Sequence, residues 1–250
     1  MKKVALIVFG LCLVTIVNAQ TADEVIMNYF EATGGYDAWG KLENIKMTAK
    51  VNQGGMEIPL EIVQMKDGRQ YTKISLQGQT FYQGVFDGEI VWGTNFQSQK
   101  AEKSDDESIA NQKLEANDFP SDLYDYKSKG YTVELMGTET VEGTETHKLK
   151  ITKEPKTVDG EKVDIVAFYF FDTESGALLM AEQEITSGPQ KGAIAQSTMS
   201  DYDEVNGLYF PFSMTQGVKG GGSQPLIIDA IETKDEIDES VIALPESGEK

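Results

Sequence analysis

The sequence predicts a mainly β protein of the α+β class, in which an antiparallel meander follows one N-terminal helix. From residue 45 onward, apolar and polar residues alternate in short segments, as they do in half-buried strands. Turn pairs that contain glycine, such as Asp67-Gly68, separate these segments. We therefore expect ten or eleven strands in one domain that spans residues 20–250. No repeat of fixed length is present, which excludes a propeller or a solenoid.

The first 19 residues have the three-part pattern of a secretory signal peptide. Two lysines precede an uncharged apolar stretch, residues 4–17, and the small residues Val17 and Ala19 precede Gln20, the expected new N-terminus. This apolar stretch is too short to span a membrane comfortably. We therefore predict that residues 1–19 are removed and that the mature chain is exported.

Cysteine content and charge narrow the possible functions. The only cysteine, Cys12, lies in the predicted signal peptide, and Leu11 stands where a lipidation site needs a small residue. The mature chain would therefore lack thiol chemistry. The full chain has 22 basic and 41 acidic residues, so loss of the two lysines leaves a charge of about −21. This charge argues against nucleic acid and against anionic membranes as partners.

A helix is expected at the start of the mature chain. Thr21 and Glu24 have the spacing of a capping box, and a glycine pair at 34–35 ends the segment. A short second helical turn should follow, with Trp39 and Leu42 as core anchors. The apolar residues of the first helix recur at helical spacing: Val25, Ile26, Tyr29 and Phe30.

Alternation assigns the side chains of each predicted strand to two faces. Pro59 indicates that its strand lies at an edge or carries a bulge. Residues 165–171 are bulky on both faces, which implies that this strand is covered on both sides. If the concave face of a curved sheet is not filled, it forms an apolar pocket, and packing in the core is the alternative for each residue. The predicted cavity residues are Met56, Ile58, Leu60, Ile62, Phe81, Val85, Trp92, Val166, Phe168 and Phe170.

Residues 97–128 interrupt the strand pattern. The segment is polar and rich in helix formers, so we expect one helix at 104–116 and a short second helix at 119–126. Such an insertion would lie across one face or the mouth of the sheet; a solvated excursion is the alternative. Residues 245–250 form a predicted flexible tail. The candidate lid residues are Ile109, Leu114, Phe119 and Leu123.

Catalytic motifs are sparse in this sequence. His147 is the single histidine, and no nucleophile-elbow sequence accompanies it. Metal sites of the His or Cys type lack ligands, and the acidic cluster at 105–107 lacks the spacing of a calcium loop. A carboxylate pair could hydrolyse glycosides, but the sequence selects no pair. We therefore expect no enzyme activity, no cofactor and no metal, with a carboxylate-based hydrolase as the least favoured alternative.

Five segments spread along the mature chain carry a family resemblance. They begin with "ADEVIMNYFEATGGYDAWGKLENIK" and "VFDGEIVWGTN", and the remaining three cover residues 118–152, 169–185 and 200–214. In this order and spacing, the chain resembles the LolA-like outer-membrane lipoprotein-sorting protein family, in the branch common in Bacteroidetes.

The resemblance implies an incomplete, strongly curved antiparallel β-barrel with an N-terminal helix and a helical lid over an apolar cavity. It also implies a periplasmic carrier, without enzyme activity and acting as a monomer, whose cavity holds lipoprotein acyl chains or other lipids. An inner-membrane releasing transporter and an outer-membrane receptor would be its partners. An interaction or sensor module with a filled pocket is the alternative. Arg69, the only arginine, has no match to the arginine that controls the lid in such carriers, and a surface role is expected.

Overall fold

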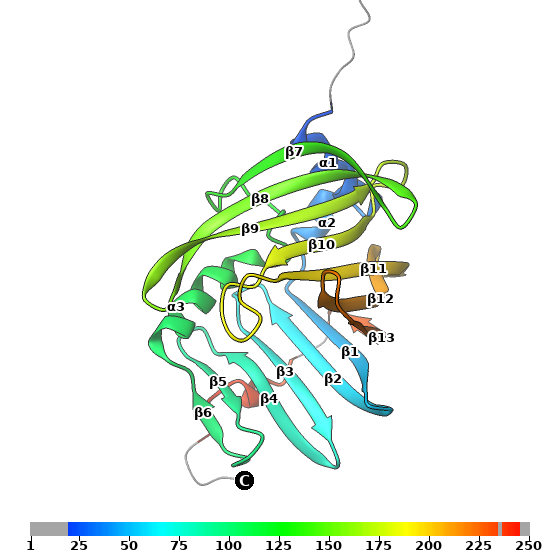
Figure 1. Ribbon diagram of the computed structural model, residues 1–250. Helices are drawn as coiled ribbons and strands as arrows, with labels where there is room; N and C mark the ends of the chain where they lie inside the picture. The colour runs from blue at the N-terminus through cyan, green and yellow to red at the C-terminus, as the bar shows by residue number, and fades with distance from the viewer. Residues whose placement is uncertain (1–19, 235–236, 246–250) are drawn as a thin grey trace, which may run out of the picture.

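Thirteen strands form a single antiparallel sheet in the computed structural model, which describes residues 20–234 and 237–245 (Figure 1). The predicted signal peptide, Cys12 and residues 246–250 of the predicted tail lie outside the described residues. The sheet is curled but not closed, and its strand order is β6-β5-β4-β3-β2-β1-β13-β12-β11-β10-β9-β8-β7.

The strands of the first half are β1 Asn44–Gln53, β2 Met56–Met65, β3 Gln70–Leu76, β4 Gln79–Phe86, β5 Val91–Thr94 and β6 Ala101–Lys103. Those of the second half are β7 Thr132–Val141, β8 Thr144–Val158, β9 Glu161–Asp172, β10 Leu178–Glu184, β11 Ile194–Val205, β12 Leu208–Val218 and β13 Ser223–Glu232. The helical elements are α1 Ala22–Ala32, α2 Tyr36–Trp39, α3 Asp106–Glu115, η1 Ala116–Asp118 and η2 Glu239–Val241.

The two halves become one sheet because the first and last strands pair. Within each half, neighbouring strands are joined in chain order, whereas β1 pairs with β13 across almost the whole chain. The prediction of a mainly β antiparallel meander is confirmed. The prediction of ten or eleven strands was too low, since even the three-residue strand β6 pairs with β5.

The first helix begins as the sequence predicts. The Thr21 hydroxyl accepts a hydrogen bond from the Glu24 backbone N–H at 3.2 Å, and the Glu24 carboxylate accepts one from the Thr21 N–H at 2.7 Å. This capping box satisfies two N–H groups that have no partner within the helix. Gly34 adopts a φ of 116°, and a Cβ at this position would lie 2.3 Å from the Gly207 carbonyl oxygen. Glycine is therefore required where α1 meets the turn between β11 and β12.

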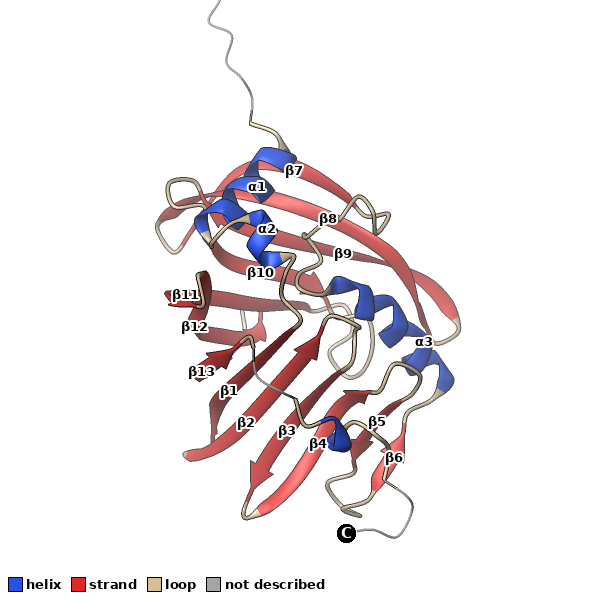
Figure 2. Cartoon of the chain, turned by 180° about the vertical axis from the view of Figure 1, so that it is seen from behind, coloured by secondary structure: helices blue, strands red, loops and turns tan. Residues whose placement is uncertain are grey.

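Helices α1 and α2 fill one end of the concave side of the sheet (Figure 2). The four predicted apolar residues of α1 are buried, and so are Trp39 and Leu42. The Trp39 indole N–H donates to the Thr33 hydroxyl at 3.0 Å, so this polar group is satisfied inside the core. Strand residues complete the same cluster: Ile45, Ala49, Leu149, Ile151, Ala167, Phe171, Leu208, Phe210, Leu226, Ile228 and Ile231.

The predicted insertion is shorter and less helical than expected. Residues 101–103 belong to the sheet as β6, so the excursion from the sheet starts after Lys103. Helix α3 lies within the predicted range 104–116, and Asp105 caps it by accepting from the Ser108 N–H at 2.7 Å. The predicted helix at 119–126 is wrong, because this segment forms turns. There the Ser121 hydroxyl accepts from the Leu123 N–H at 3.2 Å, a local bond that competes with helix formation.

Pro59 sits where β2 lacks a partner on one side. It pairs with Lys50 of β1, whereas the pairing of β2 with β3 starts only at Leu60. The strand is therefore an edge at this position, as predicted from the missing N–H of proline.

Candidate functional site: the concave face of the sheet

The concave face is the side of the sheet that faces α1 and α2. Two rows of apolar side chains cross it at right angles to the strands, because directly paired residues point to the same side. The first row comprises Ile228, Ala49, Leu60, Ile74 and Phe81, in strands β13, β1, β2, β3 and β4. The second row comprises Met199, Met214, Leu226, Val51 and Ile58, in strands β11, β12, β13, β1 and β2.

These rows are buried at some positions and open at others. Ile228, Ala49 and Phe81 are buried, whereas Leu60 and Ile74 between them are partly exposed. Phe96, in the turn between β5 and β6, stacks on Phe81 with 4.8 Å between ring centroids and is itself 51% exposed. An apolar strip with a partly exposed centre is therefore present on the β1–β4 part of the concave face.

A second hollow of about 440 Å³ lies on the same face over β9, β10 and β11. Two small side chains contribute to its floor, Ala167 beside its partner Gln183 and Ala181 beside its partner Tyr169. Ala195 and Ser197 of β11 continue these two rows. Small residues side by side leave room above the sheet that the larger side chains of β1–β4 do not leave.

Helix α3 connects the two halves of the open sheet, which we call the first arm (β1–β6) and the second arm (β7–β13) (Figure 1). On one side Ile109 packs with Phe86 and Val91 of β4 and β5. On the other side the Asn111 amide donates to the Thr157 carbonyl at 2.6 Å and accepts from the Thr157 N–H at 2.9 Å. The amide thus takes the place of a neighbouring strand at the end of β8, and the helix bridges the gap that keeps the barrel incomplete.

The carboxylate of Glu107 adds a further contact between α3 and the second arm. It accepts from the backbone N–H groups of Asp159 and Gly160, each at 2.9 Å, in the turn between β8 and β9. Lys156 of β8 forms an ion pair with Glu115, the last residue of α3. The helix is therefore fixed more firmly to the β8–β9 hairpin than to β4 and β5, where the contacts are apolar.

A polar network anchors the segment that follows α3. The Lys153 ammonium lies 2.7 Å from an Asp118 oxygen and 3.1 Å from an Asp122 oxygen. The hydroxyls of Tyr131 and Tyr169 donate to Asp118 at 2.9 Å and to Asp122 at 2.7 Å. Burial opposes the charge on Lys153, but the two carboxylates outweigh it and raise the pKa of this ammonium.

The candidate lid residues reach different surroundings. Leu123 is buried in the main core, and Phe119 packs against that core from the outside. Ile109 belongs to the small cluster with Phe86 described above, and Leu114 is partly exposed. One end of the insertion therefore fills the interior with its own side chains, and the other end bridges the arms.

The structure divides the ten predicted cavity residues between two faces. Ile58, Leu60, Ile62 and Phe81 lie on the concave face, and their role in ligand binding remains a prediction. Met56 shares their parity but is 45% exposed, at the turn between β1 and β2.

Val85 and Trp92 lie on the convex face instead. The register of β3 and β4 shifts between Gln70 and Thr72, which turns Val85 away from the side of Phe81. Trp92 pairs with Val85 and shares its face. Strict alternation from Phe81 therefore assigns Val85 to the wrong side, because a bulge reverses the parity.

In β9, the predicted cavity residues point outward, and the residues that alternate with them point inward. Phe168 and Phe170 pack on the convex face with Val141 and Met180, and Val166 shares their parity. The inward residues are Ala167, Tyr169 and Phe171. Alternation alone cannot say which side faces the core. The lysines at alternate positions of β8 could have indicated the outer side. Lys148 pairs with Phe170, and its ammonium lies 5.0 Å from the centroid of that ring.

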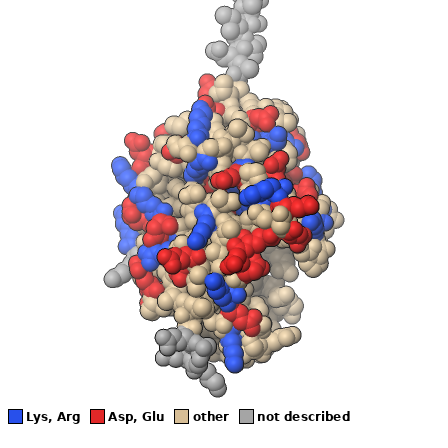
Figure 3. All heavy atoms as spheres, turned by 90° about the vertical axis from the view of Figure 1, so that its left-hand side faces the viewer, with Lys and Arg blue, Asp and Glu red and all other residues tan. Residues whose placement is uncertain are grey.

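The outer surface of β7, β8 and α3 carries mixed charge rather than one acidic field (Figure 3). Ion pairs join Lys148 to Glu139 at 2.9 Å and Lys150 to Glu134 at 3.0 Å across β7 and β8. Such exposed pairs contribute little to stability. Basic side chains are interspersed with the acidic ones on this face (Figure 3).

Among residues 20–234 and 237–245, no three His, Cys, Asp or Glu side chains cluster in a way that could hold a metal ion. The same stretch contains no helix with both the length and the apolar character that a membrane crossing requires. His147 lies on β8, paired with Phe171.

Comparisons with known proteins identify the fold. The sequence matches no protein-family model, and no curated protein matches it. A LolA superfamily protein from Nitrosomonas europaea has a TM-score of 0.53 and 13% identity, over 88% of this chain and 97% of that chain. A DUF1329 family protein from Desulfovibrio piger has a TM-score of 0.55 and 14% identity, over 88% and 96% of the two chains.

An outer membrane lipoprotein-sorting protein domain from Vibrio parahaemolyticus has a TM-score of 0.52 and 12% identity, over 88% of this chain and 94% of that chain. At such identities the likeness concerns the fold. The chain has the LolA-like fold that the sequence resemblance implies, with an open, curled antiparallel sheet, an N-terminal helix and a helical insertion.

Proposed function

We propose that this chain with a LolA-like fold is a periplasmic carrier that binds acyl chains of lipoproteins or other lipids on its concave face and passes them toward the outer membrane. The observation that carries the proposal is the pair of apolar rows with partly exposed side chains such as Leu60 and Ile74. The signal-peptide pattern of residues 1–19 and the structural similarity to a lipoprotein-sorting domain support it.

The energetics favour long acyl chains over short ones. Each buried methylene contributes about 0.8 kcal/mol, whereas association costs about 4–15 kcal/mol in lost freedom. A chain must therefore bury at least about five methylenes before binding is favourable. The contact of α3 with β4 and β5 is the one to open for entry, because it is apolar and lacks the hydrogen bonds that hold α3 to β8.

The first experiment is native mass spectrometry of the mature protein purified from a bacterial envelope, followed by solvent extraction. Co-purified lipid or acylated peptide would identify the class of cargo. The companion measurement is titration with a fluorescent fatty acid. A protein that is free of lipid and does not bind the probe would contradict the carrier proposal.

A matched pair of variants ties binding to the concave face. Ile74→Glu places a charge on the apolar row, whereas Ser75→Glu places the same charge on the opposite, exposed side of β3. We expect I74E to weaken probe binding by about tenfold or more, the effect of about 1.4 kcal/mol, and S75E to leave it unchanged. Equal affinities for the two variants would place the lipid elsewhere.

An interaction or sensor module without cargo is the second candidate function. The observation that favours it is that Leu123 is buried in the main core and Phe119 packs against that core, so side chains of the insertion occupy part of the interior. The fatty-acid titration separates the two candidates, since a module of this kind would leave the probe unbound in the wild-type protein.

A further inference from the structure

The C-terminal segment crosses the convex face of the first arm, over β3 and β4 (Figure 2). We refer to residues 237–245 as the C-terminal strap. Ile242 of the strap is 3% exposed and is the only strap residue that is fully buried. The sheet residues that surround it, here called the convex socket, come from four strands: Val63, Met65, Tyr71, Val85 and Trp92.

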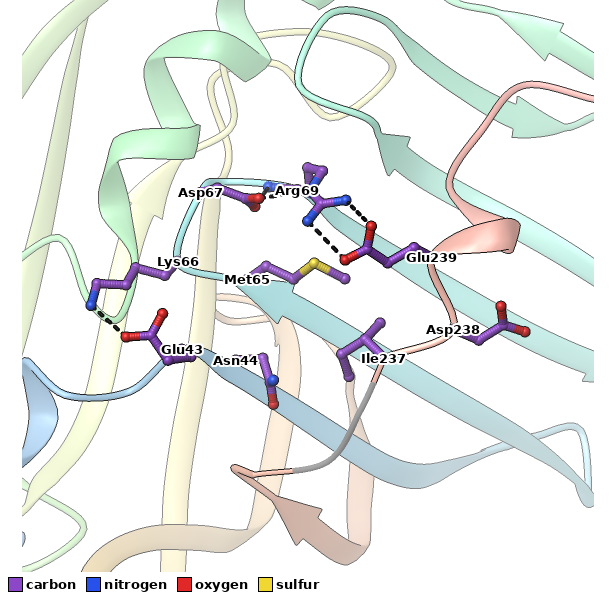
Figure 4. A pocket seen from close by; sticks show the side chains of 9 residues that line it. All are labelled: Glu43, Asn44, Met65, Lys66, Asp67, Arg69, Ile237, Asp238 and Glu239. Carbon is purple, nitrogen blue, oxygen red and sulfur yellow. Dashed lines mark hydrogen bonds and ion pairs between the residues drawn. The ribbon is translucent and has the colours of Figure 1, made fainter.

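Two polar contacts fix the strap in this socket. The Trp92 indole N–H donates to the Ile242 carbonyl at 2.8 Å. The Arg69 guanidinium donates twice to the Glu239 carboxylate, at 2.9 and 3.2 Å, while its Nε donates to Asp67 at 2.7 Å (Figure 4). The paired contact with Glu239 is the fork geometry that arginine offers to a carboxylate. Arg69 therefore acts as a positioned receptor for an acidic side chain.

The strap is held without joining the sheet. In the described part of the chain, residues 237–245 pair with no strand, and the backbone bond from the Ile242 N–H to the Glu239 carbonyl lies within the strap itself. Segments with few buried side chains and few backbone bonds open locally at low cost. The socket belongs to paired strands, so it remains formed when the strap leaves.

The socket also extends beyond what the strap covers. A groove of about 880 Å³ lies between the strap, the start of β1 and the turn from β2 to β3 (Figure 4). Met65 and Ile237 give it an apolar floor, and Arg69 lies at its wall. A chain longer than the strap can therefore lie in the same site.

We propose that the convex socket is a peptide-binding site, which the strap occupies in cis. Its competing ligand would be a peptide that carries an acidic residue followed three positions later by an aliphatic one, and that forms a helical turn between them as Glu239–Val241 does. This spacing is that of Glu239 and Ile242, which meet the guanidinium, the apolar hole and the indole N–H. The aliphatic Leu244, two positions further on, packs against the same cluster.

The test uses the mature full-length chain with Ile242→Asp, which removes the strap from the socket by placing a charge in an apolar hole. The probe is a fluorescent peptide with the sequence of residues 237–245, IDESVIALP, followed by anisotropy. We expect the I242D variant to bind it. The wild-type protein should bind it at least about tenfold more weakly, because a tethered strap competes at an effective concentration of about millimolar.

Two control peptides define the chemistry. A peptide with I242D should not bind, and one with E239Q should bind several-fold more weakly and with less dependence on salt, since the ion pair with Arg69 is lost. A folded I242D protein that fails to bind the unmodified peptide would overturn the proposal.

Hydrogen exchange on the wild-type protein keeps the proposal testable if I242D does not fold. We expect the amides of residues 239–244 to exchange well before those of β2. Equal protection in the two segments would overturn it, because the strap would then open only with the sheet. Fatty-acid binding should be the same in I242D and wild type, so this test is independent of the proposed carrier function.

Discussion

The two faces of β1–β5 carry similar apolar side chains but are covered by different parts of the chain. On the concave face, α1, α2 and Leu123 of the insertion pack in one cluster with part of the apolar rows, whereas Leu60 and Ile74 stay partly exposed. On the convex face, the C-terminal strap closes over Trp92 and its neighbours until they are almost fully buried. An apolar strip on a strand is therefore not by itself evidence of a ligand site, because the covering segment decides which strip stays open.

The largest expected effect is on the convex face. Trp92→Ala should lower the free energy of unfolding by about 3–5 kcal/mol, because a large side chain that is 2% exposed leaves a cavity and the Ile242 carbonyl loses its donor. Urea denaturation measures it. Trp92→Phe, which retains most of the volume, should cost less. A loss below about 1 kcal/mol for W92A would mean that the strap and socket contribute little to the fold.

The second largest effect on stability is expected at Lys153, whose ion pairs anchor the segment after α3. Lys153→Met should destabilise the protein by about 3 kcal/mol, because two carboxylates that share one largely buried cation lose it. Thermal denaturation at neutral pH reports the change. Lys150→Met, on the outer side of the same strand, removes an exposed ion pair and should cost less than about 1 kcal/mol. Similar losses in both variants would show that the network does not hold the insertion.

The same network should make stability depend on alkaline pH. Burial and the nearby Asp122 carboxylate raise the pKa of Tyr169 well above its usual value. The native state therefore keeps a proton that the unfolded chain loses above about pH 10, so this stabilisation is present below pH 10 and falls as the pH rises. Its slope is at most about 1.4 kcal/mol per pH unit.

Tyr169→Phe removes this titration. Urea denaturation at pH 9, 10 and 11 should show a smaller loss of stability with pH for Y169F than for wild type. Tyr131 and Lys153 in the same network also have raised pKa values, so Y169F should keep part of the alkaline loss. Parallel curves for the two proteins would contradict the assignment of any of this loss to Tyr169.

The smallest expected effect on stability separates the two faces of β11. Ser197→Trp fills the hollow over β9–β11, whereas Ser200→Trp adds the same side chain on the exposed convex side. Both should change the free energy of unfolding by about 0.5 kcal/mol or less. If the lipid uses this hollow, S197W alone should weaken fatty-acid binding, by about tenfold. Unchanged binding in S197W would confine the site to the rows on β1–β4.

Local elements of this protein followed from short-range rules. The capping box at Thr21, the apolar face of α1 and the Asp-Gly turns each depend on residues a few positions apart, and all are present in the structure. Trp39 was expected in the core and lies there, since aromatic residues next to a predicted helix usually pack. The predicted helix at 119–126 failed because its polar residues bond to nearby backbone groups instead.

The pattern of neighbouring residues could not predict which face of a strand points inward. Phe168 and Phe170 look like pocket residues by composition, yet their partner strand carries lysines on that side. One register shift beside Gly84 moved Val85 and Trp92 to the convex face. The surface role expected for Arg69 left out its partner, Glu239, which lies 170 residues away in sequence.

The amino-acid sequence by itself determined the element types, the turns, the mainly β class and the resemblance to LolA-like proteins, because these depend on composition and on spacing over a few residues. Only the tertiary structure decided that β1 pairs with β13, that α3 bridges the open arms and that the strap covers Trp92. The physical reason is that each of these contacts joins residues far apart in the chain, whose free energy depends on the simultaneous burial of several segments.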